Sequence, residues 1–212
     1  MYLRRHALTV STAQGLHTTF NLELACGIKA RESGDFKLAI SHFSKAMRVS
    51  STYNERRSVW AHVYLTHMQC HDYVSAEHSV NRVLHFSRLL RDKKSLCEGM
   101  RHHGKFMLEV KHDLVRAEYD AVTARTLAID LGRLDLCWFT HLVFQVRQAQ
   151  KVSMSELRLW VTTEMKEYFT LGLKDPNVLA KRAWQRSLLR DLLVAYGLFG
   201  PVVFIWNRLR TR

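Results

Sequence analysis

The feature that most constrains this chain is a short motif that recurs along it at helical spacing. Each copy has a tight turn followed by apolar and small residues at steps of three and four, and the third copy is the weakest. The copies align on Ala39, Ala76 and Ala117, which are separated by 37 and 41 residues. A period of about 20–50 residues is the signature of a solenoid, whose units bury their apolar faces by stacking on neighbours.

Scarce chain breakers favour helices throughout. The 212 residues include nine glycines and two prolines, fewer than a β-rich chain of this length normally carries. Capping boxes are expected at Thr52 to Glu55, Ser95 to Glu98 and Ser153 to Glu156. We therefore expect helices near 18–33, 36–50, 53–70, 73–91, 95–112, 114–131, 134–150, 153–172 and 176–209.

The motif resembles the tetratricopeptide repeat, in which small residues let two helices of a pair approach closely and an aromatic fills the gap to the next repeat. The resemblance covers roughly residues 20–132. Its positions are Gly27, Ala39, Phe43 and Ala46 in the first repeat, Trp60, Ala76, Val80 and Val83 in the second, and Lys105, Ala117, Ala121 and Ala124 in the third.

This resemblance implies an all-α fold: a right-handed superhelical stack of antiparallel helix pairs, a TPR-like α-solenoid with a C-terminal capping helix. Residues 1–17 form a polar and basic lead-in, and 18–132 form three helix pairs. Residues 133–174 form a degenerate fourth pair, which rests on periodicity and capping alone. Residues 175–212 form the capping helix and an apolar tail with a basic end.

The sequence carries no motif for catalysis or cofactor binding. It has no glycine-rich phosphate loop, GxSxG elbow or HExxH pair. His67, Cys70 and His71 share one predicted helix face and could offer Zn²⁺ ligands, but a fourth ligand is not evident. We therefore predict no enzyme, no catalytic residue, no cofactor and no metal.

The formal charge of +13 suggests an acidic partner: a protein, a nucleic acid or an anionic membrane face. If the first helices of the pairs line a groove, as the resemblance implies, its basic members include Arg57, Arg101 and Lys105. Arg182, Arg186 and Arg190 add a basic stripe on the last long helix. The alternative for both sets is a solvated polar helix face.

The best-known peptide site of the family is a carboxylate clamp, and this chain departs from it. The positions that would hold its basic and amide side chains are Leu24 and Ile28 in the first repeat and His102 and Phe106 in the third. A clamp for chaperone C-termini is therefore not expected. The uncharged run at 192–206 is shorter than the roughly 20 residues that span a bilayer. It is read as a capping helix, with an interfacial anchor or a partner-binding helix as alternatives.

Four cysteines without CxxC spacing favour a reducing compartment, and we expect a cytoplasmic location. The alternative is mitochondrial, because residues 1–22 contain Arg4, Arg5 and several Ser and Thr but no acid. The leading hypothesis is a non-catalytic adaptor or scaffold that binds a protein or peptide through a helical-repeat groove, within a larger complex. The alternatives are an RNA- or DNA-associated subunit of a ribonucleoprotein, and a peptide-sensing regulator or a membrane-surface adaptor. The oligomeric state is left open.

Overall fold

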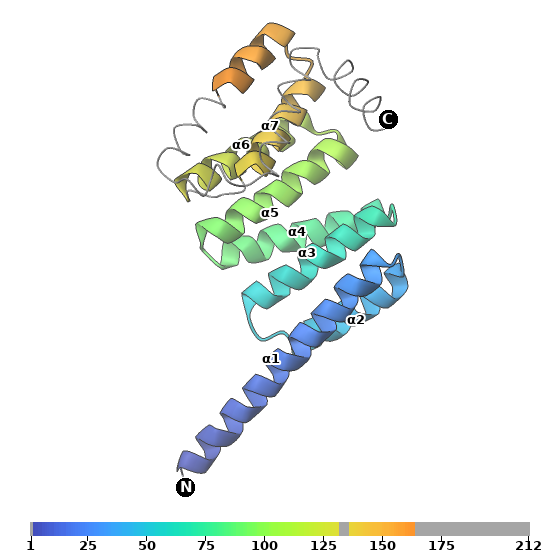
Figure 1. Cartoon of the computed structure of the whole chain (residues 1–212), viewed down its shortest axis with the longest axis vertical. Helices are drawn as coiled ribbons and strands as arrows, with labels where there is room; N and C mark the ends of the chain where they lie inside the picture. The colour runs from blue at the N-terminus through green and yellow to red at the C-terminus, as the bar shows by residue number, and fades with distance from the viewer. Residues whose placement is uncertain (1, 132–135, 164–212) are drawn as a thin grey trace, which may run out of the picture. The chain divides into compact units, whose positions relative to one another are not determined.

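A computed structural model describes residues 2–131 and 136–163 of the chain, and these residues form helices with no strand. The chain divides into two compact units, Met1–Gly99 and Met100–Arg212. Figure 1 shows the helices in chain order. They are α1 (Tyr2–Glu32), α2 (Phe36–Val49), α3 (Tyr53–Gln69), α4 (Tyr73–Leu89), α5 (Lys93–Phe106), the π-helix η1 (Met107–Lys111), α6 (Leu114–Asp130), α7 (Leu136–Ala149) and a further helical stretch at 154–163.

Helices that are consecutive in the chain pack together within each unit. In the first unit α1 packs on α2, α2 on α3 and α3 on α4, and in the second α6 packs on α7. The all-helical, repeat-like architecture expected from the motif is thus present. No helix among the described residues is long and apolar enough to cross a membrane.

The motif residues occupy the helix interfaces. All nine of the expected small and apolar positions on α2, α4 and α6 are fully buried: Ala39, Phe43, Ala46, Ala76, Val80, Val83, Ala117, Ala121 and Ala124. Gly27 on α1 faces the Phe43 ring so closely that a Cβ built there would lie 2.5 Å from a ring carbon. Small residues at these positions allow close helix packing, as the sequence predicts.

Three turns of the chain repeat one geometry. Asp35, Asp72 and Asp113 each cap the following helix by accepting a hydrogen bond from the backbone N–H three residues on. Each Asp follows a residue in the left-handed region, with φ of 83° at Gly34, 60° at His71 and 54° at His112. The left-handed residue ends one helix and the Asp begins the next, which keeps each helix pair tight.

Helix starts differ from the predictions at two places. The first helix begins at Tyr2 instead of near residue 18, because nothing between them interrupts helical backbone and the lone Gly15 is tolerated within α1. The expected capping box at Ser95 and Glu98 is wrong. Asp92 caps α5 by accepting from the Ser95 N–H at 2.7 Å, and the Glu98 carboxylate pairs with Arg57 instead.

The other two capping boxes are confirmed. Thr52 and Glu55 hold each other's backbone N–H groups at the start of α3. Ser153 and Glu156 do the same before the helical stretch at 154–163. The end of the fourth pair, the C-terminal segment 175–212 and the stripe of Arg182, Arg186 and Arg190 lie outside the described residues.

Candidate partner-binding groove

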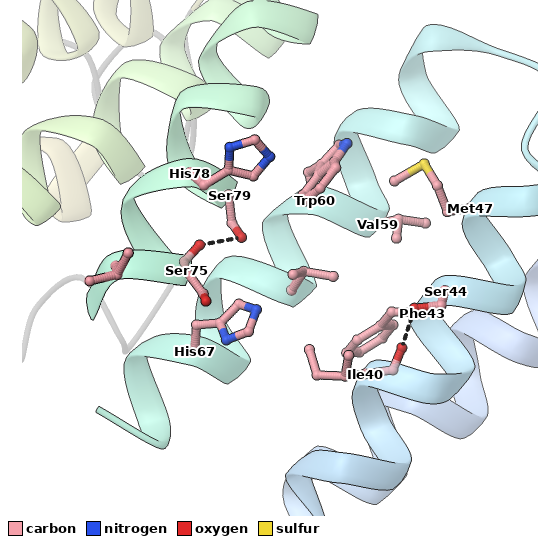
Figure 2. A pocket seen from close by; sticks show the side chains of 12 residues that line it. Ile40, Phe43, Ser44, Met47, Val59, Trp60, His67, Ser75, His78 and Ser79 are labelled. Atoms are coloured by element: carbon pink, nitrogen blue, oxygen red, sulfur yellow. Dashed lines mark hydrogen bonds between the residues drawn. The ribbon is translucent and has the colours of Figure 1, made fainter. Parts of the chain in front are cut away.

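A groove of about 500 Å³ lies on the first unit, where α2, α3 and α4 meet. Each helix contributes four residues to it, and Figure 2 shows their side chains. They are Ile40, Phe43, Ser44 and Met47 from α2, Val59, Trp60, Val63 and His67 from α3, and Val74, Ser75, His78 and Ser79 from α4. Its volume lies within the range of about 300–1,000 Å³ that is usual for binding sites.

The floor of the groove belongs to the hydrophobic core. Phe43 and Val59 are fully buried, and Phe43 is held from behind by Gly27 of α1. Val74 stands at the rim with 83% of its surface exposed. A fixed apolar floor beneath an exposed apolar rim suits a partner side chain that inserts from outside.

An aromatic pair marks one end of the groove. The rings of Trp60 and His78 meet edge to face, with centroids 5.5 Å apart, and come from facing helices (Figure 2). His67 lies toward the other end, near Ser75 in the same view. Each end of the groove therefore carries one imidazole.

The hydroxyl groups in the groove are already used by their own helices. Ser44 donates to the Ile40 carbonyl at 2.8 Å, and Ser79 donates to the Ser75 carbonyl at 2.7 Å. These bonds satisfy the hydroxyl protons locally, as serine commonly does within helices. The walls therefore present mainly apolar surface to an occupant.

Exposed cations stand on the helices that form the walls. Lys37 lies one turn before Ile40 on α2, and Arg48 lies one turn after Ser44. Arg82 follows His78 by one turn on α4. Within the part of the chain that the structure describes, none of these three cations pairs with a carboxylate. An acidic segment would therefore find unneutralised positive charge at the rim.

The basic residues predicted from the sequence lie elsewhere. Arg57 donates to the Glu98 carboxylate at 2.9 Å and to Asn54 at 3.3 Å, and only 14% of its side chain is exposed. It connects α3 to α5 and is not available as a free cation. Lys105 pairs with Glu109 at 3.7 Å on its own helical run.

Arg101 is half-buried, and its Nη2 lies 3.4 Å from Nε2 of His102. Arg101 and Lys105 belong to the second compact unit, and Arg57 does not line the groove of the first unit. The predicted groove would have been lined by α1, α3 and α5, whereas the observed groove is lined by α2, α3 and α4.

Two further polar pairs lie between helices. Arg31 of α1 lies 3.3 Å from Nδ1 of His62 on α3, and the ring of His62 stacks on Phe43. Burial, with the Arg31 charge as a second cause, lowers the pKa of His62 from 6.5 to about 4. In the second unit the buried His103 and Asp120 join α5 to α6 at 2.5 Å.

The helix face considered for zinc is engaged in other contacts. Cys70 Sγ donates to the His67 carbonyl at 3.5 Å, and Nδ1 of His71 lies 3.0 Å from the Tyr73 hydroxyl. Among the described residues, no three His, Cys, Asp or Glu side chains converge on a point that could hold a metal ion.

Sequence reasoning missed this groove because it considered only the first helix of each pair, whereas two of the three helices that line the groove, α2 and α4, are second helices. One signal was present. Val74 is the second residue of α4, and the motif residues that face the core lie on the other side of this helix, so an apolar Val74 is left exposed.

Comparison with known families and with curated proteins finds no family and no relative that matches the chain.

Proposed function

We propose that this protein is a non-catalytic adaptor that holds an acidic amphipathic helix of a protein partner in the groove of α2, α3 and α4. In this proposal the helix pairs are TPR-like and continue as a right-handed superhelical stack. The observation that carries the proposal is an apolar groove with a fixed floor and exposed cations on its walls. Binding of a helix by its apolar face is a recurring mode of peptide recognition.

The dimensions of the groove set the size of the occupant. The α2 wall runs from Ile40 to Met47, which is about 10 Å along a helix axis. That length accommodates about two turns of a partner helix, or three apolar side chains at positions i, i+4 and i+7. Lys37, Arg48 and Arg82 would face carboxylates on the flanks of such a helix. So small a contact predicts weak, reversible binding, on the order of 10 μM.

The test uses the full chain and a designed probe. The probe is a fluorescein-labelled helical peptide with leucine at i, i+4 and i+7 and glutamate on its flanks, and a second peptide replaces glutamate with lysine. Fluorescence anisotropy should show saturable binding of the acidic probe and at least tenfold weaker binding of the basic one. Equal affinity for both peptides, or no binding of the acidic probe, would overturn the proposal.

A matched pair of variants locates the site. Val74→Glu places a carboxylate at the rim of the groove, and we expect it to weaken binding of the acidic probe about tenfold, or ~1.4 kcal/mol. Val115→Glu is the control, because Val115 is equally exposed and holds the same position after a capping Asp on α6. An added acid in the first turn of a helix is tolerated in both. If both variants bind alike, the groove is not the site.

Nucleic acid is the competing occupant for a basic chain, and the same assay separates it. A fluorescein-labelled 20-nucleotide RNA is titrated at 50 and 200 mM salt. Tight RNA binding that falls steeply with salt, with no binding of the acidic peptide, would replace the proposed function with nucleic-acid association.

A further inference from the structure

Two of the twelve residues that line the groove are histidines, one from each of two facing helices. Histidine is the side chain whose ordinary charge change falls between about pH 5 and 8. His67 lies on α3 with 18% of its side chain exposed, and His78 is exposed on α4. Any segment that fills the groove therefore covers two imidazoles.

The charged groups around these imidazoles come from all three helices. At the start of α4, the carboxylate of the capping Asp72 lies 3.4 Å from Nδ1 of His67. Hydrogen bonds from the Ser75 side chain and backbone lower the pKa of Asp72, which keeps it ionised. The other charged residues that lie within one helical turn of a lining residue on the same helix are Lys37, Lys45 and Arg48 on α2, Arg56 and Arg57 on α3, and Glu77 and Arg82 on α4.

Cations outnumber carboxylates among these charged residues. The two histidines of the groove differ in the charged groups beside them. His67 has a carboxylate beside it before any partner arrives. Among the described residues, His78 contacts the Trp60 ring edge to face and pairs with no carboxylate. A carboxylate brought by a partner therefore changes the surroundings of His78 more than those of His67.

We propose that His67 and His78 make the groove a pH-sensitive receptor, which holds an acidic segment more tightly as the pH falls below neutral. This inference rests on the proposed function and adds its regulation. A partner carboxylate placed over an imidazole favours the protonated form, so the complex takes up protons and gains stability at lower pH. Protonation of the partner's own glutamates would act in the opposite direction, and only well below pH 6.

The expected size of the effect follows from linkage. A histidine whose pKa rises by about one unit on binding gives roughly fivefold tighter binding at pH 6.0 than at pH 8.0. His78 is expected to contribute the larger share, because His67 already has Asp72 as a neighbour. At constant ionic strength the rim cations do not change charge over this range, so they add no pH dependence.

The experiment repeats the anisotropy titration of the acidic probe at pH 6.0 and 8.0 with the full chain and its variants. The unmodified chain should bind roughly fivefold more tightly at pH 6.0. His78→Gln should lose most of this difference, and the double variant His67→Gln/His78→Gln should lose nearly all of it, with each variant compared with itself at the two pH values. His85→Gln is the control, since His85 is an exposed histidine of α4 outside the groove. A probe with glutamine in place of glutamate should show no pH dependence.

The outcomes separate the two proposals. Binding at pH 8.0 that is unchanged at pH 6.0 overturns the pH-sensitive receptor and leaves the adaptor function standing. A pH dependence that survives in the double variant overturns it as well, because other groups would then be responsible. Absence of binding at both pH values overturns both proposals. Far-UV circular dichroism at each pH confirms that the variants compared are folded.

Discussion

Gly27 sets how closely α1 approaches α2, and replacing it with alanine tests the helix packing directly. A Cβ at this position would lie 2.5, 2.7 and 3.0 Å from three ring carbons of Phe43. The ring is fully buried and stacks on His62 of α3, so moving it disturbs the packing of α3 as well. The variant Gly27→Ala must therefore push the two helices apart or force the ring away from its preferred conformation.

The magnitude follows from two opposing contributions. Overpacking of a well-packed core costs typically ~1–3 kcal/mol. Alanine is better than glycine within a helix by about 1 kcal/mol, which offsets part of that cost. We expect Gly27→Ala to lower the free energy of unfolding by up to about 2 kcal/mol. Gly15 provides the control on the same helix, because a Cβ there meets nothing within 4 Å. Gly15→Ala should raise stability by up to about 1 kcal/mol.

The assay is urea denaturation followed by circular dichroism at 222 nm, with the midpoints of the two variants compared at unchanged slope. The variants should shift the midpoint in opposite directions. Phe43→Leu in the Gly27→Ala background removes ring atoms from the clash, so the double variant should be more stable than the two single changes predict. A Gly27→Ala protein as stable as Gly15→Ala would refute the close approach of α1 to α2.

Two further predictions concern single polar groups. His62 has a folded-state pKa of about 4 against 6.5 for the free side chain, so the unfolded chain binds more protons between these values. The neutral His62 therefore contributes its full share to the free energy of unfolding above pH 6.5, and this share is lost as the pH falls toward 4. After allowance for partial exposure, we expect the free energy of unfolding to fall by about 2 kcal/mol over this range, measured by thermal or urea unfolding. The variant His62→Gln should not show this loss. Thr52→Ala removes the cap of α3 and should cost about 1 kcal/mol in urea unfolding, whereas Thr126→Ala, whose hydroxyl bonds only to its own helix, should change stability by less than about 0.5 kcal/mol.

The helix interfaces could be predicted from the sequence because they depend on local spacing. Residues three and four apart share a helix face whatever the rest of the chain does, so Ala39, Phe43 and Ala46 identify the buried face of α2. Capping is equally local at Thr52 and Ser153. The capping box predicted at Ser95 is wrong because a second capping residue, Asp92, lies three residues earlier. The Asp92 carboxylate accepts the Ser95 N–H that Glu98 would have accepted in the predicted box. Partial burial alone would raise the pKa of Asp92, but the hydrogen bonds from Ser95 lower it.

The groove could not be predicted in the same way, because it depends on distances between helices that are far apart in the chain. Whether α2 and α4 leave space above α3 is decided by how their side chains pack, and no spacing rule reports that. The ion pair of Arg57 could not be predicted from the sequence for the same reason. Its position on a helix face is evident from the sequence, but its pairing with Glu98, 41 residues away, depends on where α5 lies.

The third repeat shows how one inserted residue changes which side chain meets the neighbouring helix. Counted back from Ala117 as Gly27 is from Ala39, the position of close approach is Lys105. In the structure it is Gly104, where a Cβ would lie 3.1 Å from Asp120 and 3.4 Å from the Ala117 carbonyl.

The cause is the π-helix η1, which lies between Gly104 and the turn. The closing bond of this turn, from the Asp113 N–H to the Met107 carbonyl, spans six residues, whereas the bonds from Asp35 to Ala30 and from Asp72 to His67 span five. An extra residue in an α-helix would rotate everything before it by about 100°, but a π-turn absorbs the residue within one wider loop. The wider turn keeps a small residue against α6 and leaves the exposed Lys105 beside Glu109. The third repeat therefore keeps the close helix packing of the first repeat. The small residue that allows this packing is Gly104, one position earlier than the spacing from Gly27 to Ala39 predicts.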